Sequence, residues 1–185
     1  GSVTAKQALS TPAIKGGSMR IFCSCVPKTT TGLRPKMFIW IAEAPLIAAE
    51  AVGIGRVAIQ RAARYARERV VFGRPIGQNQ AIQHPLAQRF VELEAANLMM
   101  LKAASLYDQG AECGAEANAA KFLAGEAGFR ACETALMTHG GMGYAKEYHV
   151  ERYLREVLIA RIAPVSPQMT LNFIAERVLG LPKSY

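Results

Sequence analysis

The sequence contains a single tryptophan, and aromatic residues make up only 8% of it. Stretches in which apolar and polar residues alternate, the pattern of a half-buried strand, are nearly absent. Apolar residues nevertheless account for 51% of the 185 residues, which is enough for a sizeable core. Such a core must consist mainly of aliphatic residues and alanine, as in packed helices. The length fits one domain, with or without a tail.

Cysteine is also scarce, with four residues at positions 23, 25, 113 and 132. Cys23 and Cys25 are separated by one residue, with no second pair and no nearby histidine, so the spacing does not predict a zinc site. We therefore predict no metal ion. Free thiols in a reducing compartment are the expected state of these residues.

Long apolar runs are missing as well, and none reaches the roughly 20 residues that a membrane span needs. The segment from Ile21 to Val26 is too short for a signal-peptide core and is interrupted by Ser24. Basic residues are in excess, and the net charge of +8 favours an anionic partner. The arginines are spread along the chain without interleaved aromatics, so a nucleic-acid partner is disfavoured but stays open.

Two regions differ in composition. Residues 1–42 are rich in Ser, Thr, Pro, Lys and Gly, which predicts a poorly ordered segment, and Gly1-Ser2 is typical of a protease-cleavage remnant. Residues 43–185 show helical periodicity, beginning near Pro45, which suits a first helical turn. Gly53 and Gly55 would weaken this first helix, so they indicate a close helix crossing.

Further periodic segments follow the first helix. A long one runs from Gln80 to about Asp108, and an alanine-rich one runs from about Ala115 to Thr138. Two shorter helices are predicted at about Glu147 to Ile159 and from Pro167 onward, where Ser166 can cap the helix. The predicted fold is an all-α bundle of three long and two shorter helices.

The most informative stretch joins the first two helices. Arg69 offers a guanidinium group for a phosphate, Phe72 can pack on a nucleotide base or wedge the turn, and Gln80 can hydrogen-bond polar atoms of a nucleotide. The stretch resembles, without a gap, the corresponding turn in the C-terminal domain of FAD-dependent acyl-CoA dehydrogenases. In that family the turn reaches across a subunit interface to the FAD diphosphate and adenosine. An ordinary solvated basic turn is the alternative.

A glycine-rich turn follows the third predicted helix. Gly140 and Gly141 expose backbone N–H groups to a ligand, and the Gly-Gly-x-Gly-Tyr string resembles the family's loop that contacts FAD of a neighbouring subunit. The resemblance implies Gly140 and Gly141 as cofactor contacts. Met137 stands where the family usually has glutamine. We expect His139 to pack or cap rather than to catalyse.

The break before the last helix departs from the family pattern. Pro164 stands where many members carry the catalytic glutamate, and a proline cannot accept a proton. The resemblance implies Ser166 as a contact on the flavin side and Gln168 as an adenine contact, with helix capping as the alternative. Some members place the base ten residues before a glycine in the first bundle helix, and Glu43 has that distance from Gly53. Glu43 is therefore the candidate base, or else an exposed helix-entry acid.

The resemblance covers residues 43–185 and implies a fragment or truncated form of an acyl-CoA dehydrogenase. Intact members take the α-proton of an acyl-CoA with a carboxylate and pass the β-hydrogen to FAD as hydride. They then deliver electrons to an electron-transfer flavoprotein. The resemblance implies a homodimer or homotetramer, in the cytoplasm if bacterial or the mitochondrial matrix if eukaryotic. Alternatives are an inactive oligomerisation module and a DNA-associated relative. The chain alone is expected to have little activity.

Overall fold

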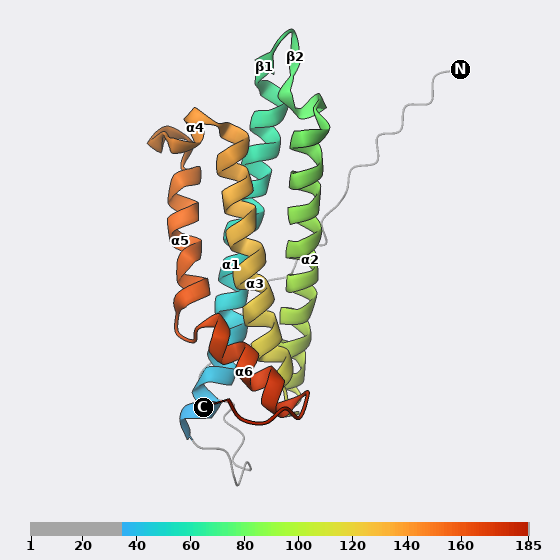
Figure 1. Ribbon diagram of the computed structural model, residues 1–185, viewed down its shortest axis with the longest axis vertical. Helices are drawn as coiled ribbons and strands as arrows, with labels where there is room; N and C mark the ends of the chain where they lie inside the picture. Colours follow the sequence, from blue (N-terminus) through green and yellow to red (C-terminus); the bar gives the residue numbers. More distant parts are fainter. Residues whose placement is uncertain (1–34, 185) are drawn as a thin grey trace, which may run out of the picture. The chain divides into compact units, whose positions relative to one another are not determined.

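The computed structural model describes residues 35–184, with side chains from residue 43 onward. Three long helices form the bundle in Figure 1: α1 at Pro35–Glu68, α2 at Gln80–Asp108 and α3 at Gly114–His139. Two shorter helices follow, α5 at Val150–Ile162 and α6 at Pro167–Arg177. The prediction of an all-α bundle with three long and two shorter helices is confirmed.

Short elements occupy two of the connections. The strands β1 (Val70–Val71) and β2 (Arg74–Pro75) form a hairpin after α1, and the 3-10 helix η1 (Ile76–Gln78) leads into α2. Between α3 and α5 lie the single-turn helix α4 (Gly141–Tyr144) and the 3-10 helix η2 (Lys146–Tyr148). The predicted glycine-rich loop therefore contains one helical turn.

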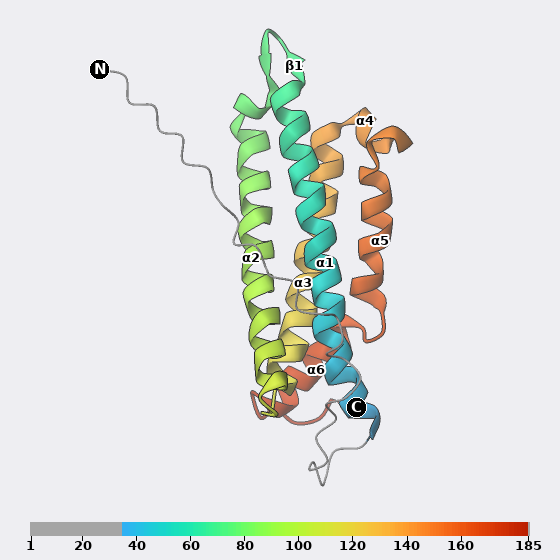
Figure 2. The ribbon, with the colours of Figure 1, turned by 180° about the vertical axis from the view of Figure 1, so that it is seen from behind.

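Helix α3 is the centre of the bundle, because it contacts α1, α2, α5 and α6 (Figures 1 and 2). Its buried positions are mostly alanines, which let the axes of neighbouring helices come close together. These alanines are at most 5% exposed: Ala117, Ala120, Ala124, Ala127, Ala131 and Ala135.

The crossing of α1 and α3 depends on glycine. A Cβ atom at Gly128 would lie 2.8 Å from the Ala51 carbonyl oxygen and 3.0 Å from Val157 Cγ2. A Cβ atom at Gly55 would lie 3.2 Å from the Gly128 Cα atom. The close crossing expected from the glycines of α1 is thus confirmed for Gly55. Gly53 is exposed, and no heavy atom lies within 4 Å of a Cβ built there.

Helix α1 begins earlier than the sequence pattern predicts. It starts at Pro35, and Pro45 lies inside it, so residues 35–42 are helical rather than poorly ordered. An internal proline removes one backbone hydrogen bond and bends a helix without always ending it. Residues 1–34 lie outside the described part of the chain, and the predicted disorder there stays a prediction.

One stretch, Val150–Arg177, has the length and mean hydropathy of a membrane span when these two properties are considered alone. It consists of α5 and α6, which are separated by residues 163–166. The two helices have 13 and 11 residues, and each is shorter than the roughly 20 residues that a helix needs to cross a bilayer. Both helices also pack against α3.

Candidate functional site

The β1–β2 hairpin holds Phe72 in an uncommon conformation. Val71 pairs with Arg74, and the two residues between them, Phe72 and Gly73, have φ angles of 52° and 78°. Positive φ at both positions is the type I′ turn that matches strand twist, and it is usually made by Asn-Gly or Gly-Gly. The Phe72 side chain is fully exposed. It therefore does not wedge the turn, which removes the packing role considered from the sequence.

The two arginines of this connection have different environments. Arg74 Nη2 donates to Asn79 Oδ1 at 2.9 Å, and Asn79 Nδ2 donates to the Ile76 carbonyl oxygen at 3.0 Å, which braces the return to α2. The Arg69 side chain is exposed, and within the described residues it forms no hydrogen bond or ion pair. Gln80 is exposed at the first residue of α2. Arg69 and Gln80 are thus free to meet a ligand, whereas Arg74 braces the fold.

An aromatic cluster joins the end of α1 to the end of α3. The Tyr65 and His139 rings stack with their centroids 4.4 Å apart, and Tyr148 meets both edge-on. His139 is 4% exposed, and its Nδ1 donates to the Ala135 carbonyl oxygen at 2.7 Å. His139 is therefore a packing residue, as predicted. The cluster fixes the segments that lead to Arg69 and to Gly140 at the same end of the bundle.

The turn after α3 is open to solvent. Gly140 has φ 59°, and no heavy atom lies within 4 Å of a Cβ built at Gly140 or at Gly141. Both glycines are exposed, as are Met137 and Tyr144 beside them. Figure 1 shows α4 at the same end of the bundle as the β1–β2 hairpin. The structure thus places Arg69, Phe72, Gln80, Gly140 and Gly141 at one end.

The remaining candidates lie towards the other end, near the start of α6 (Figures 1 and 2). Ser166 caps α6, since its Oγ accepts a hydrogen bond from the Met169 backbone N–H at 3.4 Å, and Pro167 is the first helical residue, as predicted. Gln168 is exposed in the first turn. Within a single chain, these residues do not join Arg69 and the glycine turn.

Glu43 lies near the same break but on α1. Its side chain is exposed, and the next residue, Ala44, lines a small pocket together with Pro164 and Val165. The part of α1 around Ala44 and the α5–α6 break are therefore neighbours in space. Both positions at which the resemblance places a catalytic base thus lie in one region, where Glu43 supplies a carboxylate and Pro164 does not.

Lys121 is a polar residue of this region that the sequence analysis missed. It is 3% exposed on α3, and its Nζ donates a hydrogen bond to the Val165 carbonyl oxygen. Burial lowers the pKa of its ammonium group. The sequence held a signal, because Lys121 occupies a position of the buried alanine face, between Ala117 and Ala124.

Among residues 43–184 no group of three or more His, Cys, Asp or Glu side chains is placed to hold a metal ion. Cys113 and Cys132 are free and buried. Burial, followed by the nearby charge of Glu156, raises the pKa of the Cys132 thiol to about 12. Burial and Glu116 raise the pKa of Cys113. Both thiols are therefore protonated at neutral pH. Cys23 and Cys25 lie outside the described residues.

Comparison with known proteins identifies the family of this chain. The profile of the family described as acyl-CoA dehydrogenase, C-terminal domain, matches residues 41–179. Acyl-CoA dehydrogenase FadE12 of Mycobacterium tuberculosis is 50% identical over 140 residues, which cover 75% of this chain and 36% of the relative. The chain thus spans about a third of the length of that relative.

Two solved structures share the fold. Butyryl-CoA dehydrogenase from Megasphaera elsdenii matches 73% of this chain and 35% of its own, with a TM-score of 0.72 and 32% identity. The FAD complex of PigA matches 77% of this chain and 37% of its own, with a TM-score of 0.73 and 29% identity. With its helical bundle and the match over residues 41–179, the chain belongs to the acyl-CoA dehydrogenase family through that family's C-terminal domain.

Proposed function

We propose that this chain is the C-terminal helical part of a FAD-dependent acyl-CoA dehydrogenase, and that it contributes surfaces for FAD binding and for subunit assembly. The observation that carries the proposal is the exposed end of the bundle. A free guanidinium group, an exposed aromatic ring and an open glycine turn lie at this same end. Such groups suit a ligand with a diphosphate and an aromatic base.

The residues at this end fit FAD in their chemistry. Arg69 can neutralise a diphosphate oxygen, Phe72 offers its ring face to adenine, and the absence of side chains at Gly140 and Gly141 lets a ligand approach the backbone. Bound FAD would accept the hydride from the substrate. Phe72 is held in a left-handed conformation in full contact with solvent, and such strain is common at ligand-binding sites.

The other end would serve the substrate and the flavin side. Glu43 would take the α-proton of an acyl-CoA thioester, because Pro164 offers no proton acceptor. Ser166 and Gln168 would contact the cofactor from the start of α6. Since the two ends are apart in one chain, one FAD would meet Arg69 of one copy and Ser166 of another, and assembly would complete the site. Electrons would then pass to an electron-transfer flavoprotein.

Titration with FAD tests the exposed end. Arg69→Ala is expected to weaken FAD binding about tenfold or more, because it removes a charge-assisted hydrogen bond. Arg67→Ala is the matched control, since it removes the same charge from an exposed position in the last turn of α1. Equal losses in the two variants would reduce the effect to net charge and contradict the assignment of Arg69.

A chimaera tests the reaction, because the chain alone is expected to turn over little acyl-CoA. The C-terminal domain of FadE12 is replaced by residues 41–179 of this chain, and acyl-CoA-dependent dye reduction is measured. Glu43→Gln is expected to lower the rate about a hundredfold or more, the usual contribution of a general base. Glu50→Gln, which changes another exposed carboxylate of α1, should keep the rate. An active Glu43→Gln chimaera would show that Glu43 is not the base.

A second proposal, an oligomerisation module without catalysis, has its own support. Helix α2 exposes large apolar side chains on its outer surface: Val91 at 65%, Leu98 at 67% and Leu101 at 52%. A contiguous apolar surface is typical of a protein interface. Sedimentation velocity should then give a dimer or tetramer. A monomer at all concentrations would contradict both this proposal and the shared FAD site.

A further inference from the structure

Lys121 is a charged residue inside the bundle, and the proposed reaction gives it no role. Its ammonium group is almost completely buried, and no carboxylate of the described residues forms an ion pair with it. A buried charge without a counter-ion costs folding free energy. Stability alone therefore does not account for a lysine at this place.

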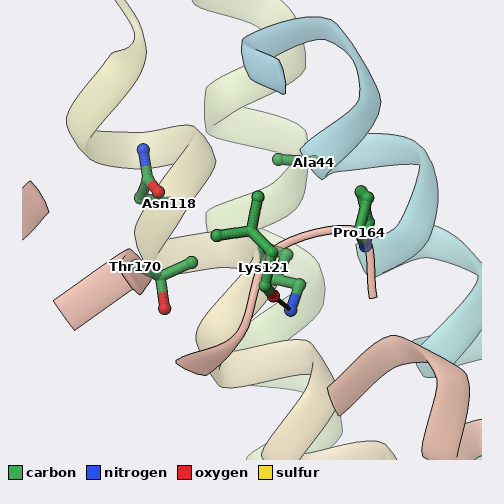
Figure 3. Close-up of a pocket in the computed structure, with 6 residues that line it drawn as sticks. Ala44, Asn118, Lys121, Pro164 and Thr170 are labelled. Carbon is green, nitrogen blue, oxygen red and sulfur yellow. Dashed lines mark hydrogen bonds between the residues drawn. The ribbon is translucent and has the colours of Figure 1, made fainter. Parts of the chain in front are cut away.

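The surroundings of Lys121 join four segments of the chain (Figure 3). A pocket of about 30 Å³ beside it can hold a water molecule but no substrate. Its lining comes from α1, from α3, from the α5–α6 break and from α6: Ala44, Asn118, Lys121, Pro164, Val165 and Thr170.

The polar neighbours of Lys121 bond within their own elements. Asn118 Nδ2 donates to the Gly114 carbonyl oxygen at 2.8 Å, and Thr170 Oγ1 donates to the Pro167 carbonyl oxygen at 2.7 Å. Lys121 instead bonds to another element, since it reaches from α3 to the Val165 carbonyl oxygen (Figure 3). Val165 immediately precedes Ser166, the capping residue of α6.

We propose that Lys121 is a positioning residue that holds the Val165 carbonyl group and thereby fixes the α5–α6 break and the first turn of α6. Ser166 and Gln168 are then kept in place by a charge-assisted hydrogen bond from the centre of the bundle. The role of Lys121 in fixing the α5–α6 break is inferred from its hydrogen bond to Val165 alone. The effect of Lys121 on cofactor binding rests on the proposed function, in which Ser166 and Gln168 contact FAD.

Amide hydrogen exchange on the full chain tests whether Lys121 fixes the first turn of α6. Lys121→Met keeps an unbranched side chain one atom shorter than lysine, but removes the donor and the uncompensated charge. Exchange at the Met169 and Thr170 amides, which bond to Ser166, is expected to rise about tenfold, the effect of losing one hydrogen bond. The midpoint of thermal unfolding should stay the same or rise, because an apolar group replaces a buried charge.

Lys102→Met is the matched control, since Lys102 is an exposed lysine of α2. It should leave exchange at the start of α6 unchanged. Unchanged exchange in Lys121→Met, or an increase spread over all helices with a lower unfolding midpoint, would overturn the proposal. Lys121→Leu, which also removes the donor, replaces Lys121→Met if that variant does not fold. Failure of both to fold would assign Lys121 to folding and also overturn the proposal.

Titration with FAD separates this inference from the proposed function. If Ser166 and Gln168 contact FAD, Lys121→Met should weaken FAD binding as well as raise local exchange. Raised local exchange with unchanged FAD binding would leave the positioning role intact and would contradict the cofactor role of Ser166 and Gln168.

Discussion

Glycine occurs in two places in this bundle for opposite reasons. At the α1–α3 crossing, Gly128 meets the backbone of Ala51 so closely that a Cβ atom would lie 2.8 Å from its carbonyl oxygen. At the turn after α3, no heavy atom outside the adjoining residues lies within 4 Å of a Cβ built at Gly140 or at Gly141. At the crossing, atoms of the neighbouring helices occupy the space that a side chain would need. At the turn, the corresponding space is open to a ligand or to a partner.

The difference separates packing from binding. A side chain added at the crossing must push two helices apart, whereas one added at Gly141 would meet solvent in the isolated chain. Substitutions at the crossing should therefore change the free energy of unfolding, and substitutions at the exposed end should change ligand binding. The predictions below test this separation, in order of decreasing effect on stability.

Gly128→Val is expected to lower the free energy of unfolding by about 3 kcal/mol, because its side chain would overlap Ala51 and Val157. Gly53→Ala is the control, since the space around Gly53 is open. It should raise the free energy of unfolding by up to about 1 kcal/mol through helix propensity. Urea denaturation measures both values, and similar effects of the two variants would contradict the close crossing.

Cys132 should make stability depend on pH in alkaline solution. Its thiol pKa is raised from 9.0 to about 12 in the folded chain, so the unfolded chain loses this proton first as the pH rises. The stabilisation is complete below pH 9 and is lost between pH 9 and 12. Between pH 9 and 10.5 the loss is about 2 kcal/mol.

Urea denaturation at several pH values, compared with Cys132→Ala, isolates this effect from the ionisation of other groups. The variant should lose less stability than the original chain over the same range. Parallel curves would show that burial does not protect the Cys132 thiol from ionisation.

Tyr65→Leu tests the aromatic cluster that joins the end of α1 to the end of α3. It removes ring contacts with His139 and Tyr148 but keeps an apolar side chain, so the free energy of unfolding should fall by about 1 kcal/mol. Thermal unfolding measures the loss. No change in the unfolding midpoint would mean that the aromatic cluster does not hold the two segments together.

Phe72→Asn should affect stability least. Asparagine accepts the left-handed conformation that Phe72 adopts, so the free energy of unfolding should stay the same or rise slightly. FAD binding should weaken, because the exposed ring is lost. A lower stability would mean that Phe72 packs on the fold, which its full exposure argues against.

Much of the fold could be predicted because the helices carry local signals. Ser166 and Pro167 start α6 as expected, and Gln80 and Asp108 bound α2 as expected. The start of α1 could not be predicted from Pro45. A proline affects only its own turn, and whether the helix continues through it depends on the residues before it and on tertiary contacts.

The sequence predicted the residues of the candidate site, but it did not predict which of them lie at the same end of the bundle. The string from Arg69 to Gln80 and the glycine pair were visible in the sequence, and the structure brings both to one end of the bundle. The separation of Ser166 and Gln168 from that end could not be read from the string, because it depends on how α5 and α6 return along α3. Lys121 was missed since a lysine in an alanine-rich helix is normally solvated.

The sequence by itself determined the helices, their caps and the family to which the chain belongs, because periodicity, proline, serine and glycine act over a few neighbouring residues. Only the tertiary structure decided which glycines have space for a side chain and which arginine has no hydrogen-bond partner among the described residues. It also decided that Lys121 holds the α5–α6 break. The glycines without such space and the Lys121 hydrogen bond depend on helices that are distant in sequence, and the difference between Arg69 and Arg74 depends on the folded geometry of their connection, so no local sequence pattern records them.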